Sequence, residues 1–216
     1  MSSQLLLVLA PSWSATTARL QRYARAAGDT WQAVGPEMPA TLGRAGLAWG
    51  RGLHPAMAGA AKREGDGRAP AGIFALTGLF GYGADDGRFR LPYVTARPGL
   101  KCVDDPASRH YNCLVDAADQ TPDWSSCEDM LRADARYEIG AVVAHNHAPA
   151  HPGAGSCVFL HVWESPTTPT AGCTALGRDD MFEIARWLDG ARQPRLVQLP
   201  DDAYARLQGP WDLPRR

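Results

Sequence analysis

The sequence predicts a mixed fold that is mainly β with a few helices (α+β), and three observations support this class. The 22 glycines and 17 prolines are spread along all 216 residues, as turns between short strands require. Most apolar runs have strand length, and only a few segments have helical spacing. The hydrophobic fraction of 45% is sufficient for a core without metal or disulfides. We therefore predict one domain over residues 1–216.

The first half of the chain predicts strands and one helix. The run QLLLVLA at residues 4–10 indicates a buried strand, and a cleaved export leader is the second interpretation, although no basic residue precedes the run. Residues 16–27 have apolar side chains at helical spacing with arginines between them, which predicts a surface helix. Residues 43–70 predict a long loop. Four short strands are predicted at residues 31–34, 40–42, 73–76 and 91–95.

The second half predicts two helices and three strands. Residues 125–135 begin with serines suited to an N-cap and have Glu128 in the first turn, which predicts a helix. Residues 179–188 have the apolar spacing of a second helix. The strands are predicted at residues 139–144, 156–163 and 196–199.

Charge and cysteine content exclude several classes of protein. The chain has 22 basic and 23 acidic residues, and this balance argues against nucleic acid as a partner. No segment is long enough to span a membrane. Five cysteines leave at least one free thiol, and no CxxC spacing suggests a zinc site. In an oxidising compartment Cys102 and Cys113 are one candidate disulfide.

A cysteine and a histidine form the candidate reactive pair. In a strand over residues 156–163, alternation places Phe159, His161 and Trp163 on the face opposite Leu160. A turn-forming loop, WESPTTPTAG, then leads to Cys173. An imidazole beside a thiol can take its proton or stabilise the thiolate, and amides around the cysteine can stabilise an oxyanion.

Several segments carry a resemblance to a known family. The stretch GSCVFLHVW followed by PTAGCTAL resembles the catalytic segment of the YkuD family of L,D-transpeptidases, in the branch with TAGC in place of SHGC. EGDGRAPAGIFAL is similar to the family segment that ends in TPxGxF. CVDDPASRHYN and WSSCEDM also resemble that branch, so the resemblance covers roughly residues 60–190.

The resemblance implies a YkuD-like catalytic domain that forms peptidoglycan cross-links in cell wall biogenesis and in the maintenance of cell shape. Cys173 is then the acyl-accepting nucleophile, His161 its base, and Gly172 and Thr174 the motif neighbours of the cysteine. The implied partners are donor and acceptor stem peptides, with no metal and no other cofactor. The implied location is the periplasm or cell envelope.

The sequence departs from the family pattern beside the cysteine. Ala171 and Ala175 stand where many members have a histidine and an arginine. His145 or His147, from the preceding strand, are candidates to supply a missing contact to substrate. The other substrate-binding candidates are Trp163 and Tyr111, although a residue such as Tyr111 in a turn-rich segment also fits a role in stabilising a loop.

The sequence leaves three alternative functions open. A peptidoglycan peptide hydrolase, either an amidase or a carboxypeptidase, fits the same cysteine and histidine. A non-catalytic peptidoglycan-binding module would keep the fold without the chemistry. A metal-dependent hydrolase could use His145, His147 and His151, but no acidic residue accompanies them at a known spacing.

The basic side chains of Lys62, Arg63 and Arg68 are predicted to form a solvated surface.

Overall fold

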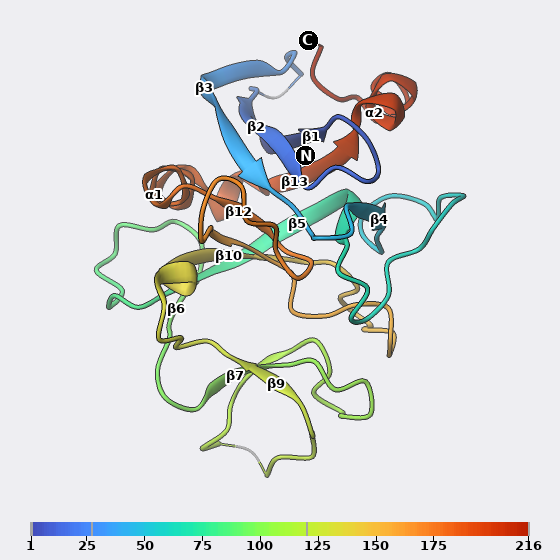
Figure 1. Cartoon of the computed structure of the whole chain (residues 1–216). Helices are drawn as coiled ribbons and strands as arrows, with labels where there is room; N and C mark the ends of the chain where they lie inside the picture. Colours follow the sequence, from blue (N-terminus) through green and yellow to red (C-terminus); the bar gives the residue numbers. More distant parts are fainter. Residues whose placement is uncertain (1, 27, 120, 216) are drawn as a thin grey trace.

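The computed structural model describes residues 2–26, 28–119 and 121–215, and its main feature is a β-sheet that closes on itself (Figure 1). The ring closes because Ile139–Val143, the strand at one end of the order, also pairs with the long strand Ala69–Gly81. Around the ring the strands are β1 (Gln4–Ala10), β2 (Thr17–Ala24), β3 (Gln32–Thr41), β12 (Thr174–Leu176), β11 (Phe159–Val162), β10 (Ile139–Val143), β5 (Ala69–Gly81) and β13 (Arg195–Pro200).

A second, smaller sheet lies at the end of the molecule opposite the two termini (Figure 1). It has the order β8 (Leu114–Asp116), β7 (Leu100–Val103) and β9 (Cys127–Asp129). The remaining elements are β4 (Leu47–Trp49) and β6 (Tyr93–Thr95), both paired with β5, the helices α1 (Arg178–Trp187) and α2 (Asp201–Leu207), and the 3-10 turns η1 (Ala135–Tyr137) and η2 (Gly190–Arg192). The prediction of a mainly β fold with few helices is confirmed.

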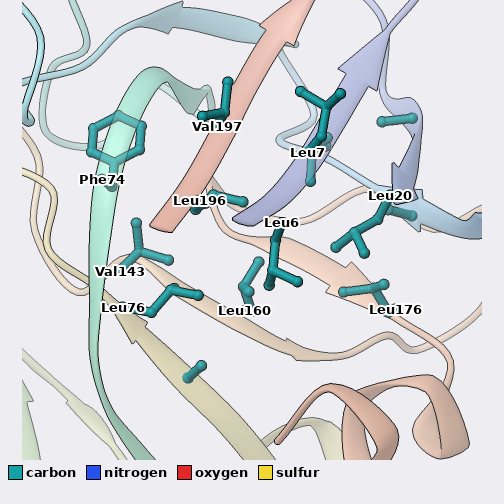
Figure 2. Close-up of a cluster of buried hydrophobic side chains, with 14 of the residues drawn as sticks. Leu6, Leu7, Leu20, Phe74, Leu76, Val143, Leu160, Leu176, Leu196 and Val197 are labelled. Atoms are coloured by element: carbon teal, nitrogen blue, oxygen red, sulfur yellow. The ribbon is translucent and has the colours of Figure 1, made fainter. Parts of the chain in front are cut away.

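Leucines from many strands fill the inside of the ring. Figure 2 shows Leu6, Leu160 and Leu196 converging from three strands, and each is no more than 1% exposed. Burying one such side chain contributes about 1.5–3 kcal/mol relative to exposure. The ring is therefore stabilised mainly by this shared apolar interior, and the predicted strand at residues 4–10 is confirmed as the fully buried β1.

A second apolar layer lies on the outer face of the ring, against the small sheet. Alternation along β11 separates the two layers, since Leu160 packs in the ring and Phe159 in the outer layer. Phe80, Phe159 and Tyr137 contact one another edge to face, with ring centroids 5.0–5.7 Å apart. The predicted division of side chains between the two faces of this strand is thus confirmed.

Two predicted helices are wrong. Within residues 16–27, of which residue 27 lies outside the described ones, β2 forms because both β1 and β3 pair with it. Its Arg22 is buried, because it forms an ion pair with Glu183 at 2.5 Å and lies over the Trp187 ring. Within residues 125–135 the N–H and hydroxyl of Ser125 bond to Asp105 instead of capping a helix, and β9 pairs with β7.

The disulfide also differs from the predicted candidate. Cys102 pairs with Cys157 rather than with Cys113, and their Cα atoms are 5.9 Å apart. The cause is the direction of the side chains, because Cys102 and Cys157 both face the outer apolar layer whereas Cys113 is exposed. Cys113, Cys127 and Cys173 are free. The bond links the small sheet to the residues that lead into β11.

A short polar network crosses the interior of the ring. The Thr174 hydroxyl donates to Gln198 Oε1 at 2.6 Å, and Gln198 Nε2 donates to the Pro70 carbonyl at 2.9 Å. Gln198 is fully buried, so both of its polar atoms need these partners. The network fixes β12 against β13 and β5.

Replacing Gln198 should therefore destabilise the fold. Gln198→Leu leaves the Thr174 hydroxyl and the Pro70 carbonyl buried without a partner, and we expect a loss of about 1–3 kcal/mol in the free energy of unfolding. Urea denaturation measures this loss. The matched control is Gln32→Leu on the exposed part of β3, where the stability should stay within roughly 0.5 kcal/mol of the parent. Equal stability of the two variants would show that the network contributes nothing.

Candidate active site

The parallel pairing of β11 with β12 brings His161 and Cys173 to the same face of the sheet. His161 lies opposite Ala175 in this register, and Cys173 precedes Ala175 by two residues. Side chains two residues apart in a strand share a face. The Phe159 N–H donates to Cys173 Sγ at 3.3 Å, so the sulfur is held beside the strand that carries the histidine.

A tight turn presents the cysteine. Thr170 Oγ1 accepts from the Gly172 N–H at 3.1 Å and donates to the Cys173 carbonyl at 2.6 Å. Gly172 has a φ of +154°, and a Cβ atom there would lie 3.2 Å from the Arg68 carbonyl. The Arg68 backbone therefore approaches Gly172 closely. A side chain at residue 172 would displace either the turn or the Arg68 backbone.

The histidine is fixed in one neutral form. His161 Nδ1 lies 2.8 Å from the Val162 carbonyl, which can only accept, so Nδ1 carries the proton and Nε2 is the nitrogen with the free lone pair. Burial lowers the pKa of His161 to about 4. The Val162 carbonyl acts in the opposite direction, and Arg132 and Arg136 lower the value further. His161 is consequently an unprotonated base at neutral pH.

The thiol is also neutral in the free protein. Burial, and next the negative charge of Glu128, raise the pKa of Cys173 to about 12. The Phe159 N–H and the Lys62 cation act in the opposite direction. The resting pair is therefore a thiol and a neutral imidazole rather than a thiolate and an imidazolium.

Both side chains line one cleft of about 280 Å³. One wall is the loop from Trp163 to Ala171, and the other comes from β9, η1 and the segment that joins them. That second wall contributes Glu128, Arg132, Arg136 and Tyr137.

The wall opposite the loop carries charge of both signs. Tyr137 donates its hydroxyl hydrogen to Glu128, and the edge of its ring packs on His161 with centroids 5.4 Å apart. Burial raises the pKa of Glu128. The Arg132 guanidinium is bonded twice to Asp134, at 3.0 and 2.8 Å, and lies over the Tyr137 ring. The cleft thus combines a sulfur, an imidazole, a carboxyl and guanidinium groups.

A lysine lies close behind the cysteine turn. Lys62 was predicted to form part of a solvated surface, but it is only 7% exposed, because its ammonium donates to Asp66 at 2.6 Å and to the Arg63 carbonyl. Burial alone would raise the pKa of Asp66, but hydrogen bonds from Lys62 and from backbone N–H groups lower it. Nζ lies 3.8 Å from where a Cβ atom of Gly172 would be. A buried cation therefore stands near the thiol.

The predicted site residues fall into two groups. Trp163 lines the cleft together with Cys173 and His161, and Thr174 turns its hydroxyl to the opposite side, toward Gln198. The cleft lining does not include Tyr111, His145 or His147. Tyr111 bonds to Glu64 and accepts from the Gly155 N–H.

His145 and His147 follow β10 and line a different hollow, which the disulfide-bonded Cys102 and Cys157 also line. Both ring nitrogens of His145 are engaged, since Nδ1 accepts from the Arg51 N–H and Nε2 donates to the Ala154 carbonyl. Burial lowers the pKa of His145 to about 4. This histidine therefore supports a loop, and the described residues contain no cluster of three or more metal-ligating side chains.

Sequence reasoning missed the wall formed by Glu128, Arg132, Arg136 and Tyr137. The available signal was the segment WSSCEDM, which ends two residues after Glu128 and indicates only the family resemblance and the start of a helix. A helix over residues 125–135 would place these side chains in other directions, so the helix prediction gave no indication of the cleft.

Comparison with known proteins gives one result that agrees with this geometry. The family model YkuD, described as the L,D-transpeptidase catalytic domain, matches residues 17–198. No curated protein matches the sequence. The matched region includes every strand of the ring except β1 and the last two residues of β13, together with the cleft and both of its walls. The chain therefore belongs to the YkuD family of L,D-transpeptidase catalytic domains.

Proposed function

We propose that this protein is an acyltransferase that joins peptidoglycan stem peptides through a thioester on Cys173. The observation that carries the proposal is the common cleft of Cys173 and His161, on one face of two paired strands. The family match supports the reaction class. The substrate is a donor stem, whose carbonyl forms the thioester, and an acceptor stem, whose amine then releases it.

The neutral resting pair suits this reaction. As the sulfur of Cys173 attacks the donor carbonyl, His161 Nε2 takes the thiol proton and then gives it to the leaving amine. The low pKa of His161 makes the imidazolium a strong acid, which favours protonation of the departing amine. The high pKa of Cys173 means that substrate binding and proton transfer must accompany attack.

The cell envelope is the location that fits this function. Members of the family are typically extracytoplasmic. The Cys102–Cys157 disulfide supports this location, because structural disulfides persist in oxidising compartments. In the portion of the chain that the structure describes, no helix is long and apolar enough to cross a membrane.

Defined monomeric muropeptides provide the direct test. The parent protein should produce dimers, and Cys173→Ala should produce none, as read by mass spectrometry. The matched control is Cys113→Ala, which removes an exposed free thiol outside the cleft and should retain activity within about twofold. Shortened stems without dimers would favour a hydrolase, and unchanged substrate would favour a binding module.

The pH dependence should reflect the buried histidine. His161 acts as a base only when unprotonated, and its pKa is lowered to about 4, so activity is lost as pH falls through that value. We therefore expect the rate of Cys173 thioester formation with a donor stem alone to be nearly constant between pH 7 and pH 5.5 and to fall below about pH 5. Circular dichroism at each pH separates this effect from unfolding. A decline centred on pH 6.5, the ordinary histidine value, would contradict the assignment.

Thiol mapping tests the proposed compartment. Protein isolated from the envelope without reductant should have three alkylatable cysteines and a peptide that contains Cys102 bonded to Cys157. Removing both bonded cysteines should lower the free energy of unfolding by roughly 2–5 kcal/mol, as seen by denaturation. Five free thiols in the protein from its native compartment would instead indicate a reducing location.

A further inference from the structure

The cleft contains a carboxyl group that the thioester chemistry does not use. Glu128 lines the cleft with Cys173 and His161, and its charge acts on the pKa of the thiol. Its carboxylate accepts from the neutral hydroxyl of Tyr137. Among the residues that the structure describes, no lysine or arginine forms an ion pair with Glu128. The Arg132 cation acts on the pKa of Glu128 from a distance. A partly buried carboxylate with no directly bonded cation is suited to receive one from a ligand.

The other charged groups of the cleft are already paired. Arg132 is bound by Asp134, and Arg136 forms an ion pair with Glu164 at 2.8 Å. Glu164 lies on the opposite wall and is exposed. Glu128 is therefore the cleft carboxylate that remains available to a substrate.

The second half of the proposed reaction requires a base that the first half does not. A primary amine reaches the site as an ammonium ion at neutral pH, and it cannot attack a thioester until it loses a proton. It must lose a second proton as the amide forms. His161 Nε2 can take one proton and return it to the sulfur of Cys173, so the other proton needs a different acceptor.

We infer that Glu128 binds the ammonium group of the acceptor stem and removes its first proton, which makes the cleft select an amine over water. This inference rests on the proposed function. The aromatic ring of Trp163, in the same cleft, also favours a cation. The raised pKa of Glu128 strengthens it as a base.

Two protons leave the acceptor nitrogen in this step. The ammonium gives one proton to the Glu128 carboxylate, and the free amine nitrogen forms a bond to the thioester carbonyl carbon. The carbon–sulfur bond then breaks, His161 moves the second proton from nitrogen to the Cys173 sulfur, and an amide and a thiol result. Glu128 finally releases its proton to water, and no oxidant or further reactant is needed.

Glu128→Gln separates the two half-reactions. With a donor stem alone, we expect the variant to form the Cys173 thioester at a rate within about threefold of the parent, as measured by intact-protein mass. With an acceptor stem added, the ratio of dimer to hydrolysed product should fall at least tenfold, since a general base contributes roughly 10²–10⁴-fold. Glu37→Gln, which removes an exposed carboxylate on β3 outside the cleft, is the matched control and should keep the parent ratio.

A neutral nucleophile distinguishes a base from a merely structural residue. Hydroxylamine is largely unprotonated at pH 7, so Glu128→Gln should transfer the acyl group to hydroxylamine at nearly the parent rate. Equal loss with hydroxylamine and with the acceptor stem would overturn the inference, and so would a parent dimer ratio in the variant. If Glu128→Gln does not fold, Glu128→Asp keeps the carboxylate and should show an intermediate ratio.

Failure of the proposed function gives a different result. In that case the parent protein itself forms no thioester with any donor stem, and the inference is overturned with it. A parent protein that forms the thioester and dimers, together with an unaffected Glu128→Gln, contradicts only the role of Glu128.

Discussion

The parallel pairing of β11 with β12 determines where both candidate reactive groups lie. A loop separates these two strands in the sequence. Their register sets His161 opposite Ala175, and Cys173, two residues before Ala175, lies on the same face. The pairing depends on its neighbours, because β10 continues the ring beyond β11 and β3 continues it beyond β12. Closure of the ring therefore removes the freedom of either strand to slip, and a slip of one residue would turn the thiol into the leucine-filled interior.

Burial sets the chemistry of this site as strongly as position does. In a low-dielectric setting the charged forms of both groups are disfavoured, so the pair rests as thiol and imidazole. Such a pair is unreactive until a substrate arrives, which protects the sulfur from oxidation. The buried Lys62, near the turn that holds Cys173, gives a fixed positive potential that opposes the effect of Glu128 on the thiol. The charges of Lys62 and Glu128 thus act in opposite directions on a neutral pair of thiol and imidazole.

The sequence predicted those parts of the structure that local pattern decides. Continuous or alternating apolar residues identified β1, β10 and both faces of β11, and turn residues identified the loop before Cys173. β2 was missed because the burial of Arg22 depends on Glu183 and Trp187, which are far away in sequence. The charged wall of the cleft was missed for a related reason, since Glu128 is oriented by the pairing of β9 with β7, and Arg132 by its bonds to Asp134, rather than by their own spacing.

The ring of strands does not form this site alone, because the small sheet provides part of it. The ring supplies the sulfur and the imidazole on its outer face, where they would otherwise meet water. The layer of Phe80, Phe159 and Tyr137 covers that face, and the Cys102–Cys157 bond holds the small sheet against it. Strand β9 of the small sheet can then place the carboxylate of Glu128 in the same cleft as the thiol. The ring therefore positions Cys173 and His161, and the small sheet and the segment that follows it supply the charged wall of the cleft.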